Sequence, residues 1–489
     1  MAEIKSSLFG HQQIALERME GKVAFALFPE PGTGKSRIIL EDSLALYRGS
    51  KINLLVVIAP AGVDRKWRDE CERWLPDSVE SPWSWHLYRN SAAKIAEARR
   101  AEFVDDVKRG DCFCIVAFSV DSIITAQGYT FIKKLLEAGP AVLAIDESTK
   151  IKNPKALRTK AALRLGQMAK YRRILTGTPL TQSVADLYSQ FQFLDEGILG
   201  IKSYFAYRKR YQNMAIGYGP GGRTFTTFMG IRNEEGLLAK IKPYSYRVSK
   251  ADCLDLPRKI YTSHYVELSK KQRLVYNQLK NDFITELSRE TIITAEMALT
   301  RFGKLQQVVS NFVTDNLGVT HTVDEEQCPR EAALVDLIQL HAPGTKFVIW
   351  AKFKREIKNI VAYLRTNFPH DNIVEYHGDV ADDMRHENVV RFQTDPDCLF
   401  FVANAMTAGL GLDLFAAHNV IYYSNTFSLE ARLQSEDRCH RPGQVNCVTY
   451  YDFEAVDTID SKILAAIHAK KSLAETITGK LGRTSSNIF

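Results

Sequence analysis

The sequence predicts an α/β protein built from two parallel-sheet lobes with a helical insertion between them. Short apolar runs rich in β-branched residues alternate with helical patterns up to about residue 195, and a second alternating series begins near Lys346. The segment between the two series is polar and helical in pattern, with a glycine-rich interruption over 217–222. We therefore expect a first lobe over 1–200, an insertion over 201–330 and a second lobe over 331–489.

The apolar runs are expected to be buried parallel strands, because strands that are covered on both faces are apolar at consecutive positions. In order along the chain, these runs are 54–59, 114–118, 142–145 and 173–175 in the first lobe, then 347–350, 373–376, 399–402, 420–423 and 448–451 in the second. An amphipathic helix over 458–479 is expected to follow as a C-terminal brace.

The composition excludes several classes of protein. With 489 residues, 45% of them hydrophobic and 25% charged, the chain has the balance of an ordinary globular protein and is not disordered. The longest apolar run, over 54–61, is far shorter than the ~20 residues that span a bilayer. The N-terminus lacks the apolar region of a secretory signal, so we expect a cytoplasmic protein without membrane contact. Eight cysteines without a CxxC pair support neither a disulfide framework nor a zinc site.

The net charge of +7 is concentrated in one stretch of the chain. Residues 201–260 carry twelve Lys and Arg against four Asp and Glu, whereas the rest of the chain is close to neutral. Basic residues interleaved with aromatic ones suit a nucleic-acid phosphate backbone, although a solvated helical face would give the same composition. The aromatic residues are Tyr204, Phe205, Tyr207, Tyr211 and Phe225.

A glycine-rich loop lies between an apolar run at 23–28 and a helical pattern at 37–46, so the order is strand, loop, helix. Its sequence is Pro31–Gly32–Thr33–Gly34–Lys35–Ser36. Glycines allow backbone N–H groups to surround phosphate oxygens, and the N-terminus of the helix adds partial positive charge. Lys35 would reach the β- and γ-phosphates, and the Ser36 hydroxyl would bind Mg²⁺. Pro29 replaces the first glycine of the full phosphate-loop pattern.

Two carboxylates, Asp146 and Glu147, follow the apolar run at 142–145. Carboxylates at the end of a buried strand are costly unless they bind a metal or transfer a proton. In nucleotidases the first carboxylate holds Mg²⁺ through water and the second orients the attacking water. A strand that simply ends in solvent gives the same pair, so the assignment depends on the glycine loop upstream.

Gln434, Arg438 and Arg441 occur in a helical run over 429–441, which Pro442 and Gly443 end. Their spacing of four and three residues places all three on one helical face. Two guanidinium groups on one face suit the γ-phosphate of a nucleotide bound by another element. The alternative is a pair of surface arginines that bridge neighbouring acidic residues of the same helix.

These sites, in this order, resemble those of superfamily-2 helicase-like ATPases, and in detail those of the Snf2 family, over nearly the whole chain. Leu8–Phe9–Gly10–His11–Gln12 resembles the adenine-reading Q motif, with Gln12 in the key position. The glycine loop resembles motif I, which in Snf2 proteins also lacks the first glycine. Asp146–Glu147–Ser148–Thr149 is similar to motif II, but Ser148 and Thr149 replace the family's Ala–His pair.

Other strings resemble the remaining Snf2 motifs. They are Leu175–Thr176–Gly177–Thr178–Pro179–Leu180 for motif III, Leu256–Pro257–Arg258–Lys259 for the linker into the second lobe, 347–350 for motif IV, 407–414 for motif V, with Leu410 and Asp413 in place of a usual Gly and Asn, and 434–444 for motif VI.

The resemblance implies two RecA-like lobes that use ATP and Mg²⁺. It implies that Gln12 and the loop residues Pro31, Gly32, Thr33, Gly34, Lys35 and Ser36 bind the nucleotide, that Ser36 and Asp146 bind the metal, and that Lys35, Asp146, Glu147, Gln434, Arg438 and Arg441 are catalytic. It also explains the basic stretch, because Snf2 proteins carry a helical protrusion there.

The resemblance further implies a translocase that moves along double-stranded DNA without separating the strands, and that remodels bound proteins or DNA junctions. By the same resemblance we expect DNA contacts at Lys66, Ser119, Lys352 and Thr407. A bare motor of this size is similar to the phage and bacterial branch of the family, so we expect a monomer in a bacterial or phage-infected cell. Two alternatives remain: a strand-separating DNA or RNA helicase on the same scaffold, and an inactive ATPase fold that serves as a binding scaffold.

Overall fold

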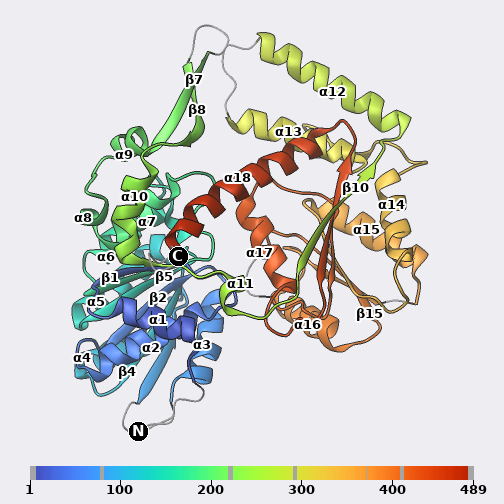
Figure 1. The fold of residues 1–489 in the computed structure, drawn as a ribbon. Coiled ribbons are helices and arrows are strands. Elements are labelled where there is room, and N and C mark those ends of the chain that lie inside the picture. Colours follow the sequence, from blue (N-terminus) through green and yellow to red (C-terminus); the bar gives the residue numbers. More distant parts are fainter. Residues whose placement is uncertain are drawn as a thin grey trace, which may run out of the picture. The chain divides into compact units, whose positions relative to one another are not determined.

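Two parallel β-sheets form the centres of two structural units (Figure 1). The computed structural model describes residues 7–76, 82–218, 224–289, 295–370, 372–407 and 412–482. Unit 1 comprises Met1–Asn213, Phe228–Asp255 and Ser472–Phe489, and unit 2 comprises Met214–Thr227 and Leu256–Lys471.

The sheet of unit 1 has seven strands in the order β3-β4-β2-β5-β6-β1-β9, and every neighbouring pair is parallel. Its strands are β1 (Ala24–Leu27), β2 (Leu54–Ala59), β3 (Trp83–Leu87), β4 (Phe113–Ser119), β5 (Ala141–Asp146), β6 (Tyr171–Leu175) and β9 (Ser245–Tyr246). The four strands predicted for the first lobe are therefore confirmed. The edge strands β3 and β9 were not predicted, because β3 is only partly buried and β9 has two residues.

Helices cover both faces of this sheet, since alternate residues of each strand enter two separate cores. Phe25 and Leu27 pack on one face with α1 to α3, whereas Ala26 and Phe28 face the larger core that includes α4 to α7. The helices of unit 1 are α1 (Gly10–Met19), α2 (Lys35–Arg48), α3 (Val63–Trp74), α4 (Lys94–Arg109), η1 (Ser122–Ile124), α5 (Ala126–Ala138), η2 (Ser148–Ile151), α6 (Leu157–Gly166), α7 (Asp186–Leu194), α8 (Glu196–Leu199), α9 (Tyr204–Tyr211), α10 (Glu234–Ile241), η4 (Lys242–Tyr244) and α11 (Lys250–Cys253).

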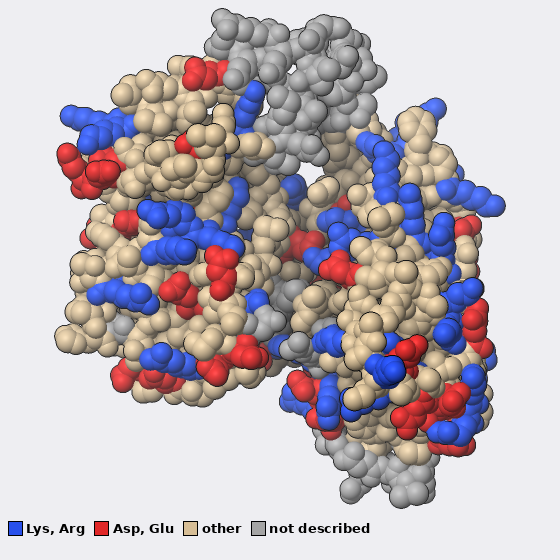
Figure 2. All heavy atoms as spheres, turned by 180° about the vertical axis from the view of Figure 1, so that it is seen from behind, with Lys and Arg blue, Asp and Glu red and all other residues tan. Residues whose placement is uncertain are grey.

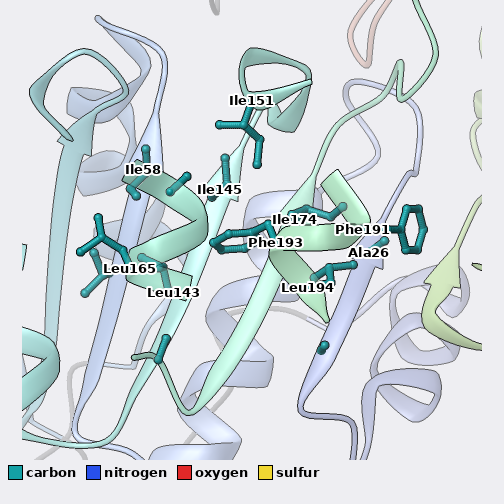
Figure 3. Packing of buried hydrophobic residues seen from close by; sticks show 14 of the residues in the cluster. Ala26, Ile58, Leu143, Ile145, Ile151, Leu165, Ile174, Phe191, Phe193 and Leu194 are labelled. Atoms are coloured by element: carbon teal, nitrogen blue, oxygen red, sulfur yellow. The ribbon is translucent and has the colours of Figure 1, made fainter. Parts of the chain in front are cut away.

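The larger core fixes α7 against the strands that end at the candidate site. Figure 3 shows Phe191, Phe193 and Leu194 of α7 close to Ile174 of β6 and Ala26 of β1. Each of these side chains is at most 2% exposed. Burial of this kind contributes roughly 25 cal/mol for each Å² of apolar surface, so the strand ends are held by a stable layer.

The sheet of unit 2 has six strands in the order β10-β17-β16-β13-β15-β14, again with parallel neighbours. Its strands are β10 (Lys259–Val266), β13 (Phe347–Trp350), β14 (Asn372–Tyr376), β15 (Cys398–Ala403), β16 (Asn419–Tyr422) and β17 (Val448–Ala455). All five runs predicted for the second lobe are strands of this sheet. The sixth strand, β10, was not predicted, because most of its residues are exposed and it has no apolar run.

Helices also cover both faces of the second sheet. Phe347 and Ile349 face a core with α14 and α15, whereas Val348 and Trp350 face a core with α16 and α17. The helices are α12 (Lys270–Arg289), α13 (Ala295–Val309), α14 (Pro329–Gln339), α15 (Lys354–Asn367), α16 (Asp382–Thr394), α17 (Leu429–Cys439) and α18 (Ile459–Gly482). The predicted C-terminal helix is α18, and its residues Ile477 and Leu481 belong to the core of unit 1.

The segment 201–330, for which we expected a helical insertion with a glycine-rich interruption, contains strands as well as helices. It contains the strand pairs β7 (Gln212–Tyr218) with β8 (Thr224–Ile231) and β11 (Phe312–Thr314) with β12 (Thr320–Thr322). In addition it supplies β9 to the first sheet and β10 to the second, and its residues are divided between the two units. These strands are short or exposed, so they leave little apolar periodicity in the sequence.

Two further observations concern the whole described chain. In the parts that the structure describes, no helix is both long enough and apolar enough to cross a membrane. All eight cysteines lie in those parts, and each is a free thiol.

Candidate functional site

The glycine loop joins the end of β1 to the start of α2 at the carboxyl edge of the first sheet. Gly32 and Gly34 have φ values of 84° and 87°, in the left-handed region that favours glycine. Helix α2 begins at Lys35, and no side chain caps its first turn. The N–H groups at the start of a helix, with the positive end of the helix dipole, are suited to binding an anion such as a phosphate. The predicted residues from Pro31 to Ser36 therefore lie together at the start of α2, and their role in binding a phosphate stays a prediction.

Lys35 lies inside this loop, where its Nζ donates a hydrogen bond to the carbonyl of Pro29 at 3.0 Å. Its charge also reaches Asp146, where it lowers the pKa of the carboxyl against the effect of burial. Ser36, the next residue, is half-buried in the first turn of α2. The lysine and the hydroxyl expected at a nucleotide phosphate are thus both placed at the loop.

Gln12 and His11 on α1 contact the same loop. The Nε2 atom of Gln12 donates to the carbonyl of Thr33 at 3.3 Å, and the Nε2 atom of His11 donates to the same carbonyl at 2.8 Å. A Cβ added to Gly34 would lie 2.2 Å from Gln12 Nε2, so the glutamine rests directly on the glycine. Position 34 therefore favours glycine for its backbone conformation, and a side chain there would displace the Gln12 amide.

The acidic pair lies two strands away from the loop, at the end of β5. Trp67 Nε1 donates to one oxygen of Asp146 at 3.1 Å, and the backbone N–H of Glu147 donates to the other at 3.0 Å. Burial raises the pKa of Asp146, while Lys35 and these two donors oppose that rise. Glu147 has a φ of 49°, a strained conformation for this residue type that turns the chain sharply after the strand.

The turn after β6 connects the acidic pair with the glycine loop. Thr176 Oγ1 donates to Glu147 Oε2 at 3.1 Å, and a Cβ added to Gly177 would lie 2.4 Å from the ring of Pro31. Because β6 lies between β5 and β1, the three turns meet at one edge of the sheet. Crevices at the carboxyl ends of parallel strands are where open α/β sheets bind ligands.

The residues that depart from motif II are structural in unit 1. Ser148 is buried, and its hydroxyl donates to Gln190 Oε1 of α7 at 2.7 Å. Gln190 in turn donates to the carbonyl of Pro179, which follows the turn after β6. Ser148 therefore ties the acidic turn to α7 and to the segment of motif III. The hydroxyl of Thr149 is buried and has no hydrogen-bond partner among the described residues.

Arg247 is a site residue that the sequence analysis missed. It follows β9, and its guanidinium donates to the carbonyls of Phe28 at 2.8 Å and Gly177 at 3.3 Å. It also forms an ion pair with Glu30 at 2.8 Å, within the glycine loop. Arg247 therefore holds the loop and the turn after β6 together. Its hydrogen-bond partners Phe28 and Gly177 lie 219 and 70 residues away in the sequence, and no local sequence pattern indicates a contact over such a separation.

In unit 2, Gln434 and Arg438 lie on α17, but Arg441 lies beyond its end. The expectation of a helix that includes Arg441 was wrong, since α17 ends at Cys439. A proline disfavours helical backbone at the preceding residue, and that residue is Arg441. Both guanidinium groups still meet, because each donates to the carbonyl of Leu412, at 3.4 Å from Arg438 and 3.1 Å from Arg441.

The two arginines differ in exposure. Arg438 is 9% exposed and also donates to the backbone carbonyl of Gln434 at 3.0 Å. The side chain of Arg441 is 27% exposed and pairs with Asp413, the residue that replaces the family's usual Asn. The Nε2 atom of Gln434 is buried without a hydrogen-bond partner among the described residues. Residues 408–411 of the predicted motif V lie outside the described residues.

The base of α17 is anchored by a buried charge network. Arg432 pairs with Asp452 and with Glu436, 2.9 Å away, and its guanidinium lies 3.6 Å from the ring centre of Tyr422. Glu436 also accepts from Lys259 at 3.1 Å. Burial alone would raise the pKa of Glu436, but Lys259 and Arg432 outweigh it and lower the pKa to about 2.

This shift predicts an acid-dependent loss of stability. Since the folded state lowers the pKa of Glu436, its contribution is present above the unfolded value of 4.5 and is lost as pH falls towards 2. We expect Glu436→Gln to lower the free energy of unfolding at pH 7 by about 3 kcal/mol and to flatten its fall between these pH values. Urea unfolding across that pH range measures both effects. The exposed Glu387→Gln on α16 is the control, and equal curves for both variants would contradict the prediction.

The four residues predicted to contact DNA are distributed over both units. In unit 1, Lys66 is exposed on α3, and the hydroxyl of Ser119 at the end of β4 lies 2.6 Å from that of Ser122. In unit 2, Lys352 is half-buried and its ammonium donates to Gln306, while the N–H of Thr407 donates to Asn404. Their role as DNA contacts stays a prediction.

The aromatic residues of the basic stretch differ in exposure. Tyr207 and Tyr211 of α9 are fully buried and pack in a row with Tyr188. Phe205, in contrast, is 76% exposed beside the basic residues of the same helix. Figure 2 shows one face of the molecule, on which lysine and arginine side chains lie among acidic ones. Sequence could not separate these aromatic residues, because α9 has almost no apolar periodicity.

Comparison with known proteins identifies both halves of the chain. The profile of the SNF2-related domain matches residues 14–313, and that of the helicase conserved C-terminal domain matches residues 330–443. An uncharacterized ATP-dependent helicase of Mycoplasma pneumoniae is 25% identical over 96% of this chain and 42% of its own length. The TATA-binding protein-associated factor 172 of Homo sapiens is 27% identical over 68% of this chain and 20% of its own length. The chain thus spans less than half the length of these relatives.

A solved structure is also similar. The Sulfolobus solfataricus SWI2/SNF2 ATPase core in complex with dsDNA matches 99% of this chain and 97% of its own, with 22% identity and a TM-score of 0.41.

Proposed function

The chain belongs to the SNF2-related family of helicase-like proteins, and from this premise we propose that it is a DNA-dependent ATPase that moves along double-stranded DNA. The observation that carries the proposal is the meeting of three turns at the carboxyl edge of the first sheet. Lys35 of the glycine loop, Asp146 with Glu147, and Thr176 with Gly177 all lie there. This combination is what cleavage of a nucleoside triphosphate requires: donors for phosphate, a metal ligand and a group that positions water.

ATP would bind with its phosphates on the N–H groups of the glycine loop and its base near Gln12. Lys35 would exchange its bond to the Pro29 carbonyl for the β- and γ-phosphates. Ser36 and Asp146 fit Mg²⁺, since a hydroxyl and a carboxylate are oxygen ligands of the kind that this ion binds, and a bound cation would oppose the effect of burial that raises the pKa of Asp146. Mg²⁺ would neutralise charge on the phosphates as they separate. Glu147, held by Thr176, would orient the attacking water.

Arg438 and Arg441 would supply positive charge to the γ-phosphate from unit 2, with Gln434 beside them. Their shared contact with the Leu412 carbonyl keeps the two guanidinium groups together, and Gln434 Nε2 is left unpaired among the described residues. The two units would close around ATP and reopen after hydrolysis, and each such cycle would shift the contacts with DNA once. These contacts would be made with the phosphate backbone and not with the bases. The energy of hydrolysis would be used to displace bound proteins or to move DNA junctions.

The test is the ATPase rate without nucleic acid and with single-stranded DNA, duplex DNA, a four-way junction or RNA. We expect strong stimulation by duplex DNA, together with displacement of a triplex-forming strand and no separation of the duplex itself. Preference for single strands or RNA, with strand separation, would instead establish a helicase. Hydrolysis that no nucleic acid stimulates would overturn the proposal.

The contacts of Arg247 lead to a second prediction about ATP hydrolysis. Replacing Arg247 by methionine removes three charge-assisted hydrogen bonds that join the glycine loop to the turn after β6. We expect KM for ATP to rise about tenfold, with a smaller effect on kcat, because the nucleotide must then order the loop itself. Steady-state kinetics measure the split. Arg158→Met removes an exposed arginine of unit 1 and is the control; a normal KM in Arg247→Met would show that the brace is dispensable.

A further inference from the structure

The side-chain amide of Gln306, on α13, lies at a buried junction of unit 2. It is 1% exposed, and both of its polar atoms have partners. Its Oε1 accepts a hydrogen bond from Lys352 Nζ, and its Nε2 donates to the carbonyl of Asn425 at 2.9 Å. Lys352 and Asn425 follow the neighbouring strands β13 and β16. Gln306 therefore bridges two strand ends, although it belongs to none of the helicase-like motifs.

On one side, the junction extends to the turn that contains Thr407. Asn404 Nδ2 donates to the carbonyl of Lys352 at 2.6 Å. The Oδ1 atom of the same amide accepts from the N–H groups of Met406 at 2.9 Å and Thr407 at 3.2 Å. Lys352 and Thr407, the two predicted DNA contacts of unit 2, are thus joined through one asparagine.

On the other side, the junction extends to α17. Asn425 Nδ2 donates to Asp452 at 2.9 Å, and Asn425 Oδ1 accepts from Arg432 at 3.0 Å. Arg432 lies in the first turn of α17 and pairs with Glu436, one turn further along the same helix. Arg438 follows two residues after Glu436. A continuous set of hydrogen bonds therefore leads from Thr407 to the helix of the proposed catalytic arginine.

We propose that Gln306 is a positioning residue that couples DNA contact at Lys352 and Thr407 to the position of α17. The inference rests on the proposed function and deepens it, because it identifies how a bound duplex would stimulate hydrolysis. The junction is buried, so a polar group that lost its partner there would remain unsatisfied at considerable cost. A shift of the Lys352 ammonium towards a phosphate would break its bond to Gln306 Oε1 unless Gln306, and with it the Asn425 carbonyl, moved too. Burial lowers the pKa of Lys352, so an approaching phosphate also stabilises its charged form.

The first test is Gln306→Leu, which keeps the volume and removes both hydrogen bonds. We expect the ratio of duplex-stimulated to basal kcat to fall about tenfold, while basal kcat and the Kd for duplex DNA change less than about twofold. A purely structural role would lower Tm and basal kcat together instead. Gln307→Leu, at the neighbouring position, is the control, since Gln307 contacts the N–H of Thr314 and neither end of the junction.

Two more variants keep the test decisive. Gln306→Glu retains the acceptor for Lys352 but lacks the donor to Asn425, so it carries the test if the leucine variant does not fold. Asn404→Asp retains the acceptor for Thr407 but lacks the donor to Lys352. If both residues act in one connection, the double variant Gln306→Leu/Asn404→Asp loses no more stimulation than the more severe single variant.

The outcomes separate the inference from the function on which it rests. A stimulated wild type with an unchanged ratio in Gln306→Leu, or additive losses in the double variant, would overturn the inference alone. A wild type that duplex DNA does not stimulate would overturn the proposed function and the inference with it. A tenfold lower ratio with normal DNA binding supports both.

Discussion

Replacing Glu147 by glutamine is expected to lower kcat for ATP hydrolysis by about three orders of magnitude while ATP still binds. Glutamine has the shape of glutamate and can still accept the hydrogen bond from Thr176, so the turn after β6 should keep its position. What it loses is the negative charge that, in the proposed function, would orient the attacking water. The variant should therefore accumulate as an ATP-bound protein.

Single-turnover hydrolysis and equilibrium binding of a fluorescent ATP analogue measure the two quantities separately. Glu137→Gln, which removes an exposed carboxylate from α5 in the same unit, is the matched control and should leave both unchanged. If Glu147→Gln kept more than about a tenth of the wild-type kcat, another group would have to orient the water. If it lost ATP binding, Glu147 would belong to the structure of the pocket and not to the chemical step.

The local backbone structure around the glycine loop could be predicted from the sequence. The glycine loop needs one strand, two left-handed glycines and one helix start, all within about 25 residues. Each of these features requires particular residue types, so each can be recognised in the sequence. The place of Asp146 and Glu147 at the end of β5 could be predicted as well, because they follow a clear apolar run, whereas their proposed role depended on the glycine loop upstream. The strand order that brings the two together is not local, and only the family resemblance indicated it.

Contacts between distant segments could not be predicted. Arg247 and Glu30 are separated by 217 residues, and the arginine follows a strand of only two residues. Gln306 lies in an amphipathic helix in which a buried glutamine gives no pattern of its own. We predicted the end of α17 two residues too late, at Arg441 instead of Cys439. Proline disfavours helical backbone at the residue before it, so Pro442 disfavours helical backbone at Arg441 as well. The aromatic residues of α9 were grouped by composition, whereas packing against Tyr188 separates them.

Arg438→Ala is expected to lower kcat for DNA-stimulated hydrolysis by about three orders of magnitude, with little change in the Kd for ATP. A guanidinium that contacts the γ-phosphate as the bond breaks stabilises charge that the bound substrate does not yet have. Because Arg438 belongs to unit 2 and the nucleotide loop to unit 1, ground-state binding should depend on it only weakly. Arg391→Ala on α16 removes an exposed arginine of unit 2 and is the control.

Lysine at position 438 should rescue little of this loss. The guanidinium of Arg438 donates from Nε to the carbonyl of Gln434 and from a terminal nitrogen to that of Leu412, and these two bonds fix its direction. A lysine ammonium is a single point charge and cannot reproduce this fork. Arg441 shares the Leu412 carbonyl but is more exposed and paired with Asp413, so Arg441→Lys should retain more activity than Arg438→Lys. The reverse order would show that Arg441 is the residue that contacts the γ-phosphate and that Arg438 positions it.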